Sequence, residues 1–309
     1  MKKSLIALAA SMAVVAGAQA ETKLYGKFNV SAGQAYGKSA GEDTSAWFLE
    51  SHASRLGVKG SEDLGSAKAI YQMEFEVYVD DGQGDSSKGS DTFEQRNIYV
   101  GLDYGQLGSV RLGHYDTPTK VSQGKFDLFN DVVDFKNVLD GENRSSNQIN
   151  YTTADMGGLQ VSASTMMAEA DGVGNGTSVS VTYKVGGLYL AASMDDNVKE
   201  ESVQRVTAIY QAGDIRLGVL AQQVDEKDVC TDCEQLGYAA NVSFKLGNNV
   251  LKAQVETGDQ KAEGTQVATV GLDHKMGKAT TAYALYTQSD ADADDSETSA
   301  VAVGLVHKF

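Results

Sequence analysis

The chain has 309 residues, a formal net charge of −16, 33 glycines and a single proline, Pro118. This acidity argues against nucleic acid as a partner, because binding to phosphates needs clustered lysine and arginine side chains that carboxylates do not cancel. Many glycines and one proline suit strands joined by tight turns, since proline interrupts the hydrogen-bond ladder of a sheet. The composition therefore favours an all-β chain that does not bind nucleic acid.

The first 20 residues, MKKSLIALAASMAVVAGAQA, contain two lysines, an uncharged apolar stretch and the small-residue triplet Ala18-Gln19-Ala20. This three-part pattern is typical of a secretory signal peptide that is removed after export. We therefore expect a signal peptide at 1–20, a mature domain at 21–309 and export through the periplasm. After residue 20, no apolar segment approaches the ~20 residues of a transmembrane helix, which excludes a helical membrane protein.

Several segments alternate between apolar side chains on one face and charged or amide side chains on the other. In residues 22–32, for example, Leu24, Phe28 and Val30 alternate with lysine, tyrosine and asparagine side chains. The same alternation recurs in the segments AIYQMEFEVYV (69–79), RSSNQINYTT (144–153) and LKAQVET (251–257). Alternation of this kind predicts strands with one apolar and one polar face.

The predicted strands are joined alternately by short glycine turns and by longer polar segments. The seven short turns lie at 63–65, 104–108, 155–158, 185–187, 212–214, 246–249 and 276–278. The eight longer loops are expected near 36–49, 80–91, 116–143, 169–176, 196–201, 225–234, 258–263 and 289–297. Sixteen antiparallel strands with tight turns at one end and long loops at the other are typical of a transmembrane β-barrel in a bacterial outer membrane.

The last nine residues, VAVGLVHKF, continue this alternation up to Phe309. Closure into a barrel removes the unpaired strand edges that a lipid bilayer cannot satisfy. We therefore expect the last strand to pair with the first.

Four stretches resemble the general diffusion porins of Gram-negative outer membranes. They are SRLGVKGSEDLG (54–65), RNIYVGLDYGQLGSVRLGHYDTP (96–118), NRSSNQINY (143–151) and the terminal VGLVHKF (303–309). The resemblance implies a sixteen-stranded barrel, a homotrimer surrounded by outer-membrane lipid and lipopolysaccharide, and a third long loop that folds inward. It also implies that the terminal aromatic residue, Phe309, is part of the signal read by the barrel-assembly machinery.

The third long loop, expected at 116–143, is the longest gap between strand patterns. It is rich in large apolar side chains, which argues against disorder and predicts that the loop packs against another surface of the protein. The resemblance implies that this surface is the inner barrel wall. It makes Asp127, Asp131 and Asp134 candidates for the acidic side of a pore constriction. The Pro-Glu-Phe-Gly-Gly motif that the family often has in this loop is missing.

Arginines from the strands are the candidates for the opposite, basic side. The resemblance points to Arg55, Arg96 and Arg144, and Arg111 joins them because it alternates with Val110 and Leu112. An ordinary strand arginine more often forms a salt bridge that holds the wall. In a lipid barrel, however, an outward arginine at the midplane costs about 2–4 kcal/mol, which favours the lumen. Opposed charges across a narrowing are how pores sort solutes.

Enzyme, metal and cofactor chemistry have little support in the sequence. His52, His114 and His274 have no recognisable serine or carboxylate motif around them, and His307 lies on the apolar face beside Phe309, where an interface role is favoured. We therefore expect no catalytic residues. Cys230 and Cys233 form one isolated Cys-x-x-Cys pair, which without a second pair does not predict a metal site. After export through an oxidising compartment, a small disulfide in an outer loop is the favoured interpretation.

These patterns predict a water-filled channel for passive diffusion of small hydrophilic solutes and ions. Acidic residues cluster in the expected loops around 194–201, 224–228 and 289–297, so we expect a modest preference for cations. One alternative is an oligosaccharide channel with an aromatic track, for which Tyr25, Tyr78 and Tyr189 are candidates. A third possibility is an adhesin-like barrel whose loops bind partners.

Overall fold

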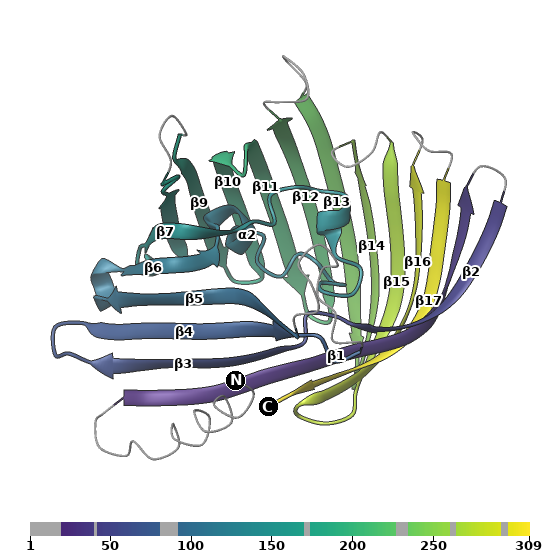
Figure 1. The fold of residues 1–309 in the computed structure, drawn as a ribbon, viewed down its shortest axis with the longest axis horizontal. Coiled ribbons are helices and arrows are strands. Elements are labelled where there is room, and N and C mark those ends of the chain that lie inside the picture. The colour runs from purple at the N-terminus through teal and green to yellow at the C-terminus, as the bar shows by residue number, and fades with distance from the viewer. Residues whose placement is uncertain are drawn as a thin grey trace.

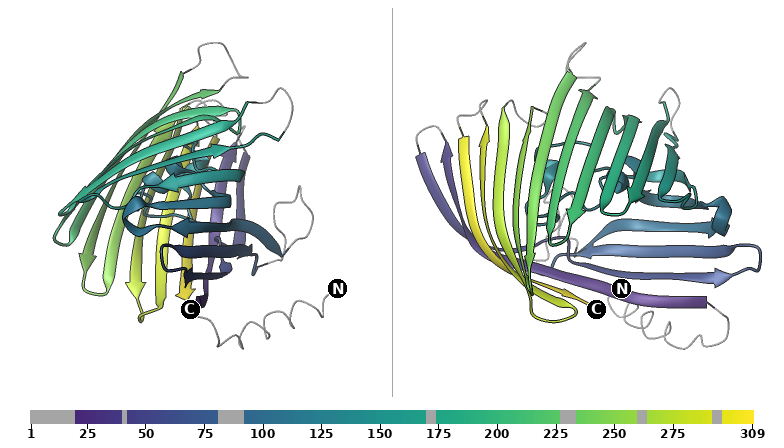
Figure 2. Two further views of the ribbon diagram at one scale, coloured as in Figure 1. Left: turned by 90° about the vertical axis from the view of Figure 1, so that its left-hand side faces the viewer. Right: turned by 180° about the vertical axis from the view of Figure 1, so that it is seen from behind.

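The computed structural model describes residues 20–39, 42–80, 92–169, 174–226, 234–259, 264–291 and 296–309. They form one antiparallel sheet that curves round and closes on itself (Figure 1 and Figure 2). Among the described residues, no helix is long and apolar enough to cross a membrane. The expected signal peptide, apart from Ala20, and both cysteines lie outside the described residues.

Every strand except the second pairs with the next strand along the chain, and the last strand pairs with the first. The first eight are β1 (Ala20–Ser39), β2 (Glu42–Ser51), β3 (Arg55–Asp63), β4 (Lys68–Val77), β5 (Phe93–Asp103), β6 (Ser109–Asp116), β7 (Arg144–Thr152) and β8 (Leu159–Met166). The others are β9 (Gly176–Val185), β10 (Leu188–Val198), β11 (Glu201–Ala212), β12 (Ile215–Glu226), β13 (Glu234–Leu246), β14 (Asn249–Gly258), β15 (Thr265–Lys275), β16 (Thr280–Ala291) and β17 (Ser296–Lys308). Three short helices complete the described fold: η2 (Gly105–Leu107), α2 (Pro118–Ser122) and η3 (Phe135–Asn137).

The seventeen strands form a barrel of sixteen, because β2 and β3 are two halves of one barrel strand. β1 pairs with β3 over 20–27 and with β2 over 30–39. Between the halves, Ala53 has a φ of +46°, and the backbone N–H of His52 donates to the carbonyl of Asn29 at 2.8 Å. The predicted sixteen-stranded barrel is confirmed.

Some loops are shorter than the sequence analysis expected. The pairing of β1 with β2 continues from Tyr36 opposite Ser45 to Ser39 opposite Glu42, inside the loop expected at 36–49. The pairing of β16 with β17 likewise reaches Asp290 opposite Glu297, inside the loop expected at 289–297. Polar side chains on both faces hid these strand ends, because alternation identifies a strand only where one face meets lipid.

The outer face carries an apolar band between two belts of aromatic side chains. On β13, Tyr238 and Phe244 are both about half exposed and lie six residues apart, which corresponds to ~20 Å along a strand. This span is close to the ≈ 25 Å apolar band of outer-membrane barrels. Exposed aromatic residues of the turn-side belt are Tyr104, Tyr151, Tyr183, Tyr210, Phe244 and Phe309, and those of the loop-side belt are Tyr36, Trp47, Tyr238 and Tyr286.

The seam between β1 and β17 closes the barrel. Gly26 and Phe309 exchange two backbone hydrogen bonds, of 3.0 and 3.1 Å, so the chain's last residue pairs with the first strand as predicted. The Phe309 ring lies over Gly26, where an added Cβ would be 2.2 Å from the ring. Glycine is therefore the residue that lets this ring cover the seam.

We expect Gly26→Val to weaken the seam, because its side chain would displace the Phe309 ring. The measurement is the temperature at which the folded gel band of the unheated protein converts to the unfolded band, which should fall. Gly277→Val is the matched control, since nothing lies within 4 Å of a Cβ at Gly277. Equal conversion temperatures for both variants would contradict the role of this seam.

Candidate pore constriction

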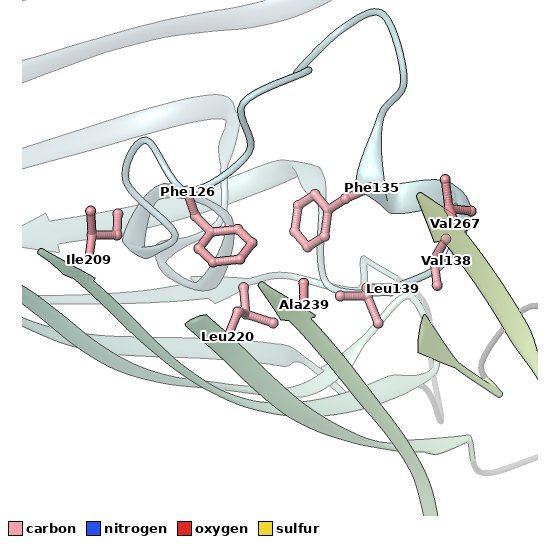
Figure 3. Packing of buried hydrophobic residues seen from close by; sticks show 8 residues of the cluster. All are labelled: Phe126, Phe135, Val138, Leu139, Ile209, Leu220, Ala239 and Val267. Carbon is pink, nitrogen blue, oxygen red and sulfur yellow. The ribbon is translucent and has the colours of Figure 1, made fainter. Parts of the chain in front are cut away.

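The long loop between β6 and β7, residues 117–143, packs against the inner face of the barrel. Its Phe126 and Phe135 contact a buried cluster with Ile209, Leu220 and Ala239 (Figure 3). The strand neighbours Val219 and Tyr238 are about half exposed on the outer face, so Leu220 and Ala239 point inward. The apolar residues that the sequence analysis noticed in this loop are therefore buried against the wall.

Polar contacts from the wall satisfy the backbone of the long loop. Gln254 accepts from the N–H of Leu128 at 2.9 Å, and Lys252 donates to the carbonyl of Leu128 at 2.9 Å. Asn241 donates to the carbonyl of Phe126 at 2.8 Å. Because buried backbone groups need partners, these strand side chains allow an irregular segment to lie inside the barrel.

Asp131 is the loop carboxylate that meets wall cations directly. It lies 2.5 Å from Lys27 and 2.8 Å from Arg55. Burial alone would raise the pKa of Asp131, but the charges of Arg55 and Lys27 outweigh burial and hold this pKa below its ordinary value. The structure thus brings together two of the predicted residues and adds Lys27, one of the lysines on the polar face of residues 22–32.

Arg96 and Arg144 pair with strand carboxylates rather than with the loop. Arg96 lies 2.8 Å from Glu74 and 2.7 Å from Glu76. Arg144 lies 2.9 Å from Asp116 and donates to Asn97 at 2.8 Å. Both side chains line the same cavity as Arg55, with their charge largely balanced within the wall.

Arg111 stands apart from the other three arginines. Its guanidinium lies 5.7 Å from the Tyr99 ring centroid and 5.4 Å from that of Tyr115, and it donates to Asn150 at 3.4 Å. It is not among the residues that line the cavity containing Arg55. The alternation of apolar and polar side chains along β6 predicts which face of the strand carries Arg111. It does not predict how far Arg111 lies from the long loop.

Asp127 and Asp134 hold the loop's own shape. Asp127 accepts from the N–H of Phe129 and from Gln254, both at 2.9 Å. Asp134 caps η3 by accepting from the N–H of Lys136 at 3.1 Å. Burial raises the pKa of Asp127 to about 6, although the bonds from Gln254 and Phe129 oppose the shift.

A cavity of about 1790 Å³ lies between the long loop and the wall. Ten lysine and arginine side chains and nine aspartate and glutamate side chains line it, but only two aromatic side chains of Phe, Tyr or Trp do so, Tyr78 and Phe93. The lining includes Arg55, Arg96 and Arg144 together with Asp127, Asp131 and Asp134. Among the described residues, no group of three or more His, Cys, Asp or Glu side chains is arranged to hold a metal ion.

Comparison with known proteins agrees with this geometry. A family model described as Gram-negative porin matches residues 4–294. The chain belongs to the Gram-negative porin family. A search of curated proteins found no match.

Solved porins share the fold of this porin. The anion-selective porin from Comamonas acidovorans is 24% identical, with a TM-score of 0.74 over 94% of this chain and 100% of that one. OmpF of Salmonella typhi, in complex with daunomycin, is 14% identical, with a TM-score of 0.71 over 93% and 97%. The trimer form of OmpT from Vibrio cholerae is 16% identical, with a TM-score of 0.67 over 95% and 100%. Family membership together with this barrel implies an outer-membrane channel.

We expect the docking of the long loop to weaken as pH rises from about 4 to about 6. The pKa of Asp127 in the docked loop is raised from 3.8 to about 6, so the neutral acid favours docking and its contribution is lost as pH rises. Hydrogen exchange of the Phe129 and Phe135 amides, corrected for intrinsic rates, should show this loss. Asp127→Asn should reduce the dependence without abolishing it, because burial also raises the pKa of the loop residue Glu142, to about 7.

Asp131 provides a comparison of opposite sign. Its pKa is lowered in the docked loop, so its contribution is present above its ordinary pKa and is lost as pH falls. Asp131→Asn should therefore speed amide exchange at neutral pH. Identical pH profiles for the wild type and both variants would refute these assignments.

Proposed function

We propose that this porin passes small hydrophilic solutes and ions by passive diffusion. The observation that carries the proposal is a cavity lined by nearly equal numbers of cationic and anionic side chains. Such a lining offers water and ions many polar partners without a site specific for one solute. An oligosaccharide track has less support, since Tyr25 donates to Glu74 and Tyr189 donates to a loop carbonyl.

We further propose that the narrowing of the pore lies where the long loop faces β3, β5 and β7. In this arrangement Arg55, Arg96 and Arg144 supply the basic side, while Asp131 and Asp134 supply the acidic side. Asp127 serves mainly to stabilise the loop conformation through its hydrogen bonds with Phe129 and Gln254. Arg111 stabilises the wall by packing on the rings of Tyr99 and Tyr115. The Asp131–Arg55 contact of 2.8 Å joins the loop to the wall inside the cavity, so in this proposal the open passage lies beside this pair, along Arg96 and Arg144.

A modest cation preference is the selectivity that we propose. Charges around the cavity are close to balance, so the acidic surplus of the chain decides the sign at the mouths. This surplus is −16 for the whole chain and −18 once Lys2 and Lys3 are removed with residues 1–20. Carboxylates beside low-dielectric walls raise the local concentration of cations. Salt should weaken the preference, because the screening length falls to ≈ 8 Å at physiological ionic strength.

Reversal potentials under a salt gradient test this proposal. Asp131→Asn should shift the cation-to-anion permeability ratio toward anions, and Arg96→Ala should shift it toward cations. Each change should be roughly two- to fivefold, since one charge a few Å away is worth about 0.5–1 kcal/mol at high dielectric. Wild-type anion preference, or shifts of the wrong sign in both variants, would refute the charge assignment.

We also propose that residues 1–20 are removed on export and that Phe309 is read by the barrel-assembly machinery. The mature protein would be a homotrimer in lipid and lipopolysaccharide, as the trimer form of the related OmpT supports. A Cys230–Cys233 disulfide is proposed for an outer loop.

Crosslinking in mild detergent should give a trimer band. The expectation rests on the trimer form of the related OmpT, and a closed ring of three copies repeats one interface. The matched comparison is the boiled sample, in which this band should disappear. Monomer alone at all protein concentrations before boiling would contradict the proposed assembly.

A further inference from the structure

One arginine outside the predicted set is buried between the long loop and the wall. Arg205 of β11 is 2% exposed and lies on the inner face, between the buried residues Val203 and Thr207. Its Nη1 donates to Glu142 at 2.7 Å, its Nη2 to the carbonyl of Asp140 at 2.5 Å, and its Nε to Gln222 at 2.8 Å. One guanidinium thus joins the returning limb of the loop to two strands.

Glu142 extends the same connection to the outgoing limb. Its second carboxylate oxygen accepts from Gln123 at 2.6 Å, and its backbone carbonyl accepts from Lys120 at 3.2 Å. Lys120 belongs to α2 and Gln123 is its C-cap residue, so both ends of the loop meet at Glu142. Arg205 and Glu142 therefore hold the outgoing limb, the returning limb and the wall together.

The space around the guanidinium accepts little displacement. Gly141 has a φ of +89°, and a Cβ at this position would be 2.9 Å from Arg205 Nη2. On another side, the Phe135 ring centroid lies 5.2 Å from the guanidinium carbon. The backbone of the loop can approach the wall this closely only because residue 141 is glycine.

The Arg205–Glu142 ion pair is expected to fix the position of the loop more than it stabilises the fold. A buried ion pair is often no more stabilising than well-packed apolar residues of the same volume, whereas removing one partner leaves a costly unpaired charge. The five hydrogen bonds of Arg205 and Glu142, however, are directional and therefore define the position of the loop. The apolar contacts of Phe126 and Phe135 are non-directional and leave the distance from the wall less defined.

We propose that Arg205 is a positioning residue that, through Glu142, sets how far the long loop stands from the barrel wall and so sets the width of the pore. This inference rests on the proposed function of the loop as the narrowing. Arg205 is absent from the lining of the cavity, so it acts through the loop and not by contact with solutes.

Burial raises the pKa of Glu142 to about 7, against the opposing charges of Arg205 and Lys120, while the charge of Asp134 adds to the rise. Without Arg205, the carboxylate must either take up a proton or drive the loop away from the wall. An apolar replacement of Arg205 should therefore be tolerated at pH 5, where Glu142 is neutral, and should release the loop at pH 8. A residue that only stabilised the barrel would not give this pH profile.

The experiment compares Arg205→Met, Glu142→Gln and the double variant in planar bilayers at pH 5 and pH 8. Arg205→Met should raise the open-channel current noise several-fold at pH 8 and admit larger neutral polyethylene glycols, with little change at pH 5. Glu142→Gln, when added to it, should restore quiet currents at pH 8, because no unpaired charge remains. Thr269→Val, which breaks a buried wall contact with Thr287, is the matched control and should leave noise unchanged.

Hydrogen exchange of the 135–142 amides separates the positioning role of Arg205 from the proposed function of the loop as the narrowing. Faster exchange in Arg205→Met at pH 8, together with a larger solute limit, is the expected result. Unchanged exchange would overturn the positioning role while leaving the proposed channel function intact. Faster exchange with unchanged noise and solute limit would overturn the role in setting pore width and also the proposal that this loop narrows the pore.

Discussion

The need to pair every backbone polar group in a medium without water governs this molecule. In lipid, an unpaired N–H or C=O costs several kcal/mol, so a sheet must close. The Gly26–Phe309 hydrogen bonds complete that closure, and every other strand pairing depends on the ring remaining shut. Because closure leaves an interior, the same constraint that satisfies the wall also creates a lumen.

A second constraint follows inside the lumen. The long loop that lies there has buried backbone polar groups, and side chains of the barrel wall must supply their hydrogen-bond partners. Strands supply side chains to the interior at every second position. Asn241, Lys252 and Gln254 occupy such positions on neighbouring strands and bond to the long loop. Apolar inward residues such as Leu220 and Ala239 are found where the loop brings phenylalanines. The inner face is thus matched to the loop and not simply polar.

Alternation and turn spacing were enough to predict the barrel and its strand number, because both follow from one local rule repeated along the chain. The resemblance to the porins, and not alternation, made Arg55 and Asp131 candidates, and the two side chains meet. The same rule could not show that Arg96 pairs with Glu74, since that contact needs the register of β4 against β5 and the irregularity beside it. Sequence reasoning missed Arg205. The residues around an inward-facing strand arginine do not show whether its side chain will contact the long loop or the water in the lumen.

The Arg55–Asp131 and Arg205–Glu142 ion pairs have the same chemistry but different roles, because their surroundings differ. Arg55 and Asp131 line the cavity, where water and salt screen their charges and the pair contributes mainly to the field that ions cross. Glu142 also lines the cavity, but its partner Arg205 does not, and both side chains of this pair are almost fully buried, so screening between them is weak. Partial access to the cavity makes the first pair a determinant of selectivity, and burial of Arg205 makes the second a determinant of geometry. A pore needs both, because the field at a narrowing depends on how far apart its two sides are held.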